Sequence, residues 1–135
     1  MPAPKHAWVS KSSQEGKPWG QTRVWNTMGN LHGKLIHIRE GERTSLKYHR
    51  VKSEVFFVME GKVRVVYGDS KTLENPEKHP YETRILEAYD ILHVQSECPY
   101  RLEALEDCRI IEVGDRSDDV PIRLEDDYGR EGRGE

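Results

Sequence analysis

The sequence predicts an all-β protein in which short antiparallel strands close into a jelly-roll barrel. Two observations support this fold class: short apolar or alternating segments recur between polar turns over residues 17 to about 114, and none of them has the apolar period of an amphipathic helix. At 135 residues the chain can bury one core but not two. We therefore expect a flexible N-terminal arm over residues 1–16, a single domain over residues 17–130 and a frayed tail over residues 131–135.

The expected strands differ in how their apolar residues are spaced. Residues 35–39 are short and apolar, and residues 62–65 alternate cleanly after a turn at Glu60-Gly61. Residues 55–59 are apolar on both faces, which is typical of a strand buried between the barrel and another surface. We expect a second copy of the chain to provide that surface, in a homodimer. The remaining expected strands are residues 85–86, 91–94, 100–105 and 109–113.

Two polar segments flank or interrupt these strands. Residues 68–83 (GDSKTLENPEKHPYET) are expected to form a long hairpin insertion, because Pro76 and Pro80 keep the segment out of a central strand. The acidic C-terminal tail is expected to pack across the barrel as far as Tyr128, with residues 125–127 (EDD) as a solvated turn.

Composition excludes several classes of partner. Charged residues make up 33% of the chain, the net charge is −3, and no cluster of Lys and Arg with interleaved aromatic residues is present, so we expect no nucleic-acid partner. No apolar run reaches the length of a membrane span, and the N-terminus lacks the apolar core of a signal peptide, so we expect no membrane partner and a cytoplasmic location. Cys98 and Cys108 form no CxxC arrangement and are expected to be free thiols.

The segment over residues 41–61 carries the most informative spacing in the chain. Lys47 and His49 are two residues apart and share one face of a strand, while Glu54 comes from the next strand after a short turn. Three polar side chains can therefore converge inside one barrel. Together with Gly41 and Gly61, this spacing resembles the cupin metal-binding motif G-x5-H-x-H-x3,4-E-x6-G. The resemblance implies a cupin double-stranded β-helix, which is a jelly-roll barrel.

A longer resemblance extends over most of residues 17–130. The matching pieces are KPWG (17–20), GKLIHI (33–38), SLKYH (45–49), Ser53-Glu54 and RLEDDYGR (123–130), of which the last is the most specific. The chain is similar to the small cupins related to the C-terminal domain of type II mannose-6-phosphate isomerases. This resemblance implies a small-molecule ligand, a sugar phosphate or nucleotide sugar, and an isomerisation or epimerisation.

Two substitutions alter the ligand set that the resemblance implies. Lys47 stands at the first ligand position, and a protonated lysine has no lone pair for a metal. Tyr100 stands where the family carries a histidine in a segment such as GDSVYIPPGAIHRLE, which here reads YDILHVQSECPYRLE. His49 and Glu54 remain as metal ligands, whereas dedicated sites usually use three or four. A divalent metal therefore stays open as a cofactor.

The same residues can support sugar isomerisation without a metal. The reaction needs a base beside the substrate carbonyl and a positive group for the developing oxyanion. Lys47 can supply the charge, His49 or Glu54 the base, and Tyr100 a proton donor, while His37, Lys47 and Tyr100 are the candidate substrate-binding residues.

Other interpretations of these residues stay open. Lys47 and Glu54 can form an ion pair that fills the former metal position, because a charge inside a barrel needs a partner. Tyr100 can be an aromatic plug, His49 a buried histidine without a catalytic role, and His37 can equally point outward. The alternatives to an isomerase are a non-catalytic cupin that binds a sugar or small anion, and a metal-dependent oxygenase.

Overall fold

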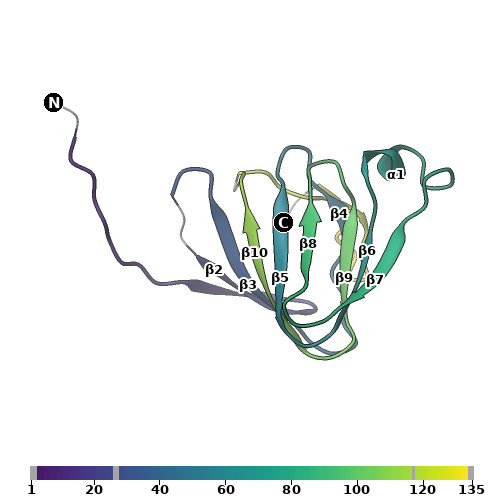
Figure 1. Cartoon of the computed structure of the whole chain (residues 1–135), viewed down its shortest axis with the longest axis horizontal. Coiled ribbons are helices and arrows are strands. Elements are labelled where there is room, and N and C mark those ends of the chain that lie inside the picture. Colours follow the sequence, from purple (N-terminus) through teal and green to yellow (C-terminus); the bar gives the residue numbers. More distant parts are fainter. Residues whose placement is uncertain (1–2, 26–27, 117, 134–135) are drawn as a thin grey trace.

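The chain folds into two six-stranded antiparallel sheets that form a barrel (Figure 1), as the sequence predicts. The computed structural model describes residues 3–25, 28–116 and 118–133. The first sheet has the order β1-β2-β3-β10-β5-β8 and the second the order β12-β11-β4-β9-β6-β7. The strands of the first sheet are β1 (Ser13–Lys17), β2 (Gly20–Trp25), β3 (His32–Ile38), β10 (Cys108–Gly114), β5 (Glu54–Glu60) and β8 (Ile91–Val94). Those of the second are β12 (Gly132–Arg133), β11 (Ile122–Glu125), β4 (Leu46–Tyr48), β9 (Tyr100–Ala104), β6 (Val63–Tyr67) and β7 (Glu82–Leu86).

The core lies between the inner faces of the two sheets. On β6, Val63 and Val65 are buried, which confirms the alternation expected for residues 62–65. Phe56 and Val58 are buried in the same alternating way on β5. Ile110, on the neighbouring strand β10, pairs with Val58 and is buried on the same face of the sheet. These side chains form part of the core, and Phe56 also borders a polar region of the barrel interior.

Strand β5 does not have both faces buried within this chain. Val55 and Met59 are 38% and 42% exposed, whereas Phe56 and Val58 on the other face are at most 2% exposed. The outer face of this sheet continues the apolar surface through Ile91 on β8, which is 48% exposed. No other segment of the described chain covers these side chains fully, so the expected homodimer stays a prediction.

The insertion over residues 68–83 contains a helical turn that the sequence analysis did not predict. Helix α1 (Ser70–Glu74) begins at Asp69, whose carboxylate accepts hydrogen bonds from the backbone N–H groups of Lys71 and Thr72. The Thr72 hydroxyl accepts a hydrogen bond from the Asp69 backbone N–H and completes a capping box. A helix of five residues is set by its cap rather than by an apolar period, so periodicity alone does not reveal it.

Short strands lie near both ends of the described chain. Residues 3–12 form an arm without secondary structure that extends away from the barrel (Figure 1), and β1 then joins the sheet as an edge strand. At the other end, β11 pairs with β4, and β12 pairs with β11. In this last strand Gly132 and Arg133 pair with Arg123 and Ile122.

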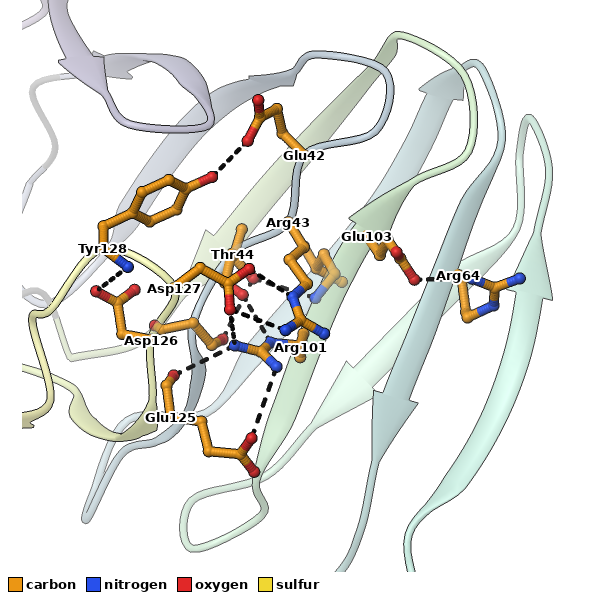
Figure 2. Close-up of polar contacts among 12 residues, drawn as sticks. Glu42, Arg43, Thr44, Arg64, Arg101, Glu103, Glu125, Asp126, Asp127 and Tyr128 are labelled. Atoms are coloured by element: carbon orange, nitrogen blue, oxygen red, sulfur yellow. Dashed lines mark hydrogen bonds and ion pairs between the residues drawn. The ribbon is translucent and has the colours of Figure 1, made fainter.

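The acidic run at residues 125–127 is largely exposed, as expected, and it also attaches the tail to the barrel (Figure 2). Asp127 accepts two hydrogen bonds, of 2.6 and 2.8 Å, from the guanidinium of Arg43. The buried carboxylate of Asp126 accepts hydrogen bonds from the backbone N–H groups of Tyr128 and Arg130. The Tyr128 hydroxyl donates to Glu42 over 2.5 Å. These contacts give the RLEDDYGR segment a structural role.

Two further observations concern the cysteines and the membrane. Cys98 and Cys108 are both free, as expected, and Cys108 is buried. Among the described residues, no helix has the length and apolar character needed to cross a bilayer.

Candidate functional site

A polar cavity of about 350 Å³ lies beside the apolar core, whose Trp19, Ile36 and Phe56 form part of its wall. Both sheets line it: the second sheet contributes Lys47 from β4 and Tyr100 from β9, and the first contributes Glu54 from β5 and Glu112 from β10. Because alternate residues of a strand point to the same face, Tyr100, Glu54 and Glu112 are in phase with buried core residues of their strands. The cavity is therefore the polar continuation of the core.

The structure brings together four of the residues that the sequence analysis singled out. The Tyr100 hydroxyl donates a 2.8 Å hydrogen bond to Glu54 Oε1, and His49 Nδ1 is 3.4 Å from the same oxygen. Lys47 is the cross-strand partner of Tyr100, and its Nζ lies 5.6 Å from the centroid of the tyrosine ring. Tyr100 points inward and is 1% exposed. All four side chains line the cavity, and their catalytic roles stay predictions.

Lys52, which the sequence analysis missed, is the ion-pair partner of Glu54. Its Nζ is 3.2 Å from Glu54 Oε2 and 3.7 Å from Glu112 Oε2. The ion pair with Lys47, which the sequence left open, is therefore replaced by one with a lysine that precedes β5. In the sequence, Lys52 reads as an ordinary turn residue, and no local pattern marks it as buried. Only the approach of β5 and β10 brings two carboxylates within its reach.

Glu112 and His32 were also missed, although the sequence carries a signal for both. Glu112 is in phase with the buried Cys108 and Ile110 on β10, and His32 is in phase with Ile36 on β3. His32 Nε2 lies 2.6 Å from Glu112 Oε2. A charged residue that keeps the phase of buried apolar residues points into the barrel. Applying the period of two to these strands would have found both residues.

His37 lies away from this cavity. It has the opposite phase to Ile36 and Ile38 on β3, and its Nε2 is 3.8 Å from Asp107 Oδ2 near the strand end. The cavity is not lined by His37, so the structure favours the outward orientation that the sequence left open. We do not include His37 in the proposed site.

The two buried carboxyl groups have opposite pKa shifts. Burial and the charge of Glu112 raise the pKa of Glu54 to about 7, against the opposing effect of Lys52 and Lys47. Burial alone would raise the pKa of Glu112 as well. The hydrogen bond with His32 and the charge of Lys52 outweigh it, and the pKa of Glu112 lies well below its usual range. Near neutral pH, Glu112 is therefore the ionised partner, and Glu54 can hold or release a proton.

The basic groups and the tyrosine are shifted mainly by burial. Burial, with the charges of Lys52 and Lys47, lowers the pKa of His49 to about 4, so its imidazole is neutral at neutral pH. Burial lowers the pKa of Lys47 to about 8, although Glu112 and Glu54 oppose the change. Burial and the charge of Glu54 raise the pKa of Tyr100 well above its usual value, so its hydroxyl keeps its proton.

The raised pKa of Glu54 predicts a stability that falls as the pH rises from 4.5, the ordinary carboxyl value, to about 7. In that interval the folded chain keeps a proton on Glu54 that the unfolded chain has released. The Glu54→Gln variant lacks this proton, so its unfolding free energy should decrease less than that of the wild type between about pH 5 and pH 7. Urea unfolding across this range measures the difference. Equal pH slopes for both proteins would contradict the raised pKa.

The residues at the cupin ligand positions do not fit a transition-metal site. Both oxygens of Glu54 are already engaged, one by Tyr100 and His49 and the other by the ammonium of Lys52. Tyr100 keeps its proton, and the lysine at the first position brings a positive charge of its own. We derive no step through a metal at these positions.

Comparisons with known proteins agree with this fold. The model of the family described as mannose-6-phosphate isomerase C-terminal matches residues 6–115. A Bacillus subtilis oxalate decarboxylase aligns with a TM-score of 0.71 and 20% identity, over 88% of this chain and 33% of that chain. KdgF from Halomonas sp. aligns with a TM-score of 0.65 and 17% identity, over 81% of this chain and 89% of that chain.

CapF aligns with a TM-score of 0.66 and 12% identity, over 80% of this chain and 31% of that chain. This chain thus spans about a third of the oxalate decarboxylase and CapF chains, and at these identities the alignments show the cupin fold alone. No curated protein sequence matches the chain. Because the family match covers most of the chain, the protein belongs to the mannose-6-phosphate isomerase C-terminal family of cupin domains.

Proposed function

We propose that this chain binds a sugar phosphate or a nucleotide sugar in the barrel cavity and isomerises or epimerises it by proton transfer. The observation that carries the proposal is the juxtaposition, in one cavity, of Lys47, a neutral His49 and the hydrogen-bonded pair of Glu54 and Tyr100. These groups are a cation, a base and an acid that titrates near neutral pH.

The charge of the cavity supports an anionic ligand. The cavity is lined by six Lys and Arg side chains and four Asp and Glu side chains, namely Lys17, Lys34, Lys47, Lys52, Arg123 and Arg130 against Glu15, Glu54, Glu112 and Asp119. Trp19 adds an aromatic wall that can pack against a sugar ring. A volume of about 350 Å³ lies within the range of small-molecule sites, which are about 300–1,000 Å³.

Each group has a distinct role in the proposed proton transfer. The neutral His49 removes a proton from the carbon beside the substrate carbonyl, and the ammonium of Lys47 stabilises the enediolate that forms. Glu54, with a pKa of about 7, can then return a proton to the neighbouring carbon. Because the Tyr100 hydroxyl donates to Glu54, Tyr100 orients this carboxyl group and is a positioning residue in the proposal.

Solvent deuterium exchange tests this function whichever product the reaction forms. The protein is incubated in D2O with aldose phosphates, ketose phosphates and nucleoside diphosphate hexoses, and the substrate proton next to the carbonyl, or at the epimerised carbon, is followed by NMR. We expect protein-dependent loss of that proton from at least one of these substrates. The exposed pair of Arg64 and Glu103 provides a control, because Glu103→Gln should leave the exchange unchanged.

A non-catalytic binding protein is the second candidate, and the Lys52 contacts favour it. The ammonium of Lys52 holds Glu54 and Glu112 in an internal ion network, as in a site whose charges serve structure. Isothermal titration calorimetry separates the two functions. Binding of a sugar phosphate without any deuterium exchange supports the binding protein, whereas binding with exchange supports the isomerase.

A further inference from the structure

One of the cations that line the cavity, the ammonium of Lys52, is buried and is supplied by the chain itself. The Lys52 side chain is 6% exposed, and its ammonium lies between the carboxylates of Glu54 and Glu112, whose side chains are 2% and 8% exposed. Gly114 makes room for it, because a Cβ at that position would lie 2.8 Å from Lys52 Cε. The position of the ammonium is therefore determined by packing as well as by charge.

The groups around this ammonium form a set of metal ligands. One ligand atom from each of His32, Glu54 and Glu112 lies within 4.8 Å of the others. An imidazole nitrogen and two carboxylate oxygens are donors that Zn²⁺ binds in sites with three protein ligands and an open position. Two of these three residues contact the Lys52 ammonium. Only Glu54 is shared with the cupin ligand positions at residues 47, 49, 54 and 100.

We propose that Lys52 is a resident cation that closes a latent divalent-metal site formed by His32, Glu54 and Glu112. A metal bonded to both carboxylates would lie next to the Lys52 ammonium, because the ammonium contacts the same two groups. Two positive charges so close together repel each other strongly. The ammonium thus places a positive charge between the two carboxyl groups and excludes a metal at the same time. Removal of its charge should convert the cluster into a metal site. This inference does not depend on the proposed isomerase function.

The test is metal binding by the Lys52→Met variant, which keeps a long unbranched side chain without the charge. Metal-free protein is titrated with Zn²⁺ by calorimetry, and bound zinc is measured by plasma mass spectrometry after dialysis. We expect Lys52→Met to retain one equivalent of zinc and to bind it tighter than the wild type by on the order of 100-fold or more. The Tm of the variant should rise with zinc concentration, and that of the wild type should not.

Two variants locate the site. Lys47→Met removes the same charge from the same cavity but leaves Lys52 between the carboxylates, so it should bind zinc no better than the wild type. Adding Glu112→Gln to Lys52→Met removes one ligand and should abolish the gained binding. Zinc binding that persists in this double variant but is lost in Lys52→Met with His49→Ala would overturn the assignment to His32, Glu54 and Glu112.

The remaining outcomes also decide the proposal. A folded Lys52→Met protein that binds no zinc overturns it, as does a wild type that binds one equivalent as tightly as the variant. If Lys52→Met does not fold without metal, refolding in zinc should restore a cooperative thermal transition. Failure to refold in zinc, together with no zinc binding by a folded Lys52→Gln protein, would equally overturn the proposal.

Discussion

Glu112→Ala is expected to lower the free energy of unfolding by about 3–5 kcal/mol, the range measured when one partner of a buried ion pair is removed. Glu112 accepts from His32 at 2.6 Å and lies 3.7 Å from the ammonium of Lys52. Its removal leaves His32 without this partner and Lys52 with Glu54 alone. The charge of Glu112 also helps to raise the pKa of Glu54, so Glu112→Ala leaves a single carboxyl group, with a lower pKa, beside the ammonium.

Urea unfolding of the wild type and Glu112→Ala measures this loss, with Glu103→Ala as the matched control. Glu103 makes a 2.8 Å ion pair with Arg64, but these side chains are 31% and 40% exposed, so its removal should cost about 0–1 kcal/mol.

The free energy of unfolding measured at acidic pH gives a second test of Glu112. Because the pKa of Glu112 is depressed, its contribution exists above 4.5, the ordinary carboxyl value, and is lost as the pH falls further. Equal losses for the two variants would show that the buried network adds no stability.

Lys47→Ala is expected to reduce deuterium exchange by about 10²–10³-fold, the usual loss when one group that stabilises an oxyanion is removed, while the barrel stays folded. The ammonium of Lys47 lies beside Tyr100 in the cavity and is the group proposed to hold the enediolate oxygen. Lys47 is half-buried and the ion pairs of Glu54 and Glu112 run through Lys52, so its loss leaves the internal network in place.

The exchange assay is run with the Lys47→Ala, Lys47→Arg and Lys62→Ala proteins. Lys62 is a 41% exposed lysine with ion-pair distances of 3.9 Å to Glu87 and Glu106, and its removal should change neither exchange nor stability. Lys47→Arg keeps the charge and should retain part of the exchange. A Lys47→Ala protein with wild-type exchange would remove Lys47 from the mechanism. A Lys47→Ala protein that keeps the wild-type melting temperature but loses deuterium exchange would support the proposed role of Lys47 in the mechanism.

Local sequence patterns were sufficient for the barrel and for part of its site. The strand at Val63 and Val65 follows from simple alternation, and the motif spacing correctly brought His49 and Glu54 to one cavity with Lys47 and Tyr100. These predictions succeeded because they depend on the period of a strand and on short turns. The resemblance to the mannose-6-phosphate isomerase C-terminal domain is confirmed by the family match over residues 6–115.

Other features depend on which segments meet in space. Glu112 and His32 are 80 residues apart in the chain and make a 2.6 Å contact because β10 pairs with β3. The helical turn α1 depends on a cap at Asp69, and the ordered tail depends on the contact between Arg43 and Asp127. Each is a contact between particular atoms that a pattern of apolar and polar residues does not describe.

The sequence by itself determined an all-β cupin barrel and the inward direction of Lys47, His49 and Glu54, because strand geometry places alternate residues on one face. Only the tertiary structure decided which cation pairs with Glu54. Lys52 takes that position because two carboxylates from strands distant in sequence converge beneath it, and because Gly114 leaves space for its side chain. A buried charge is stabilised by whatever partners the fold brings within reach, and those partners are set by strand pairing rather than by local sequence.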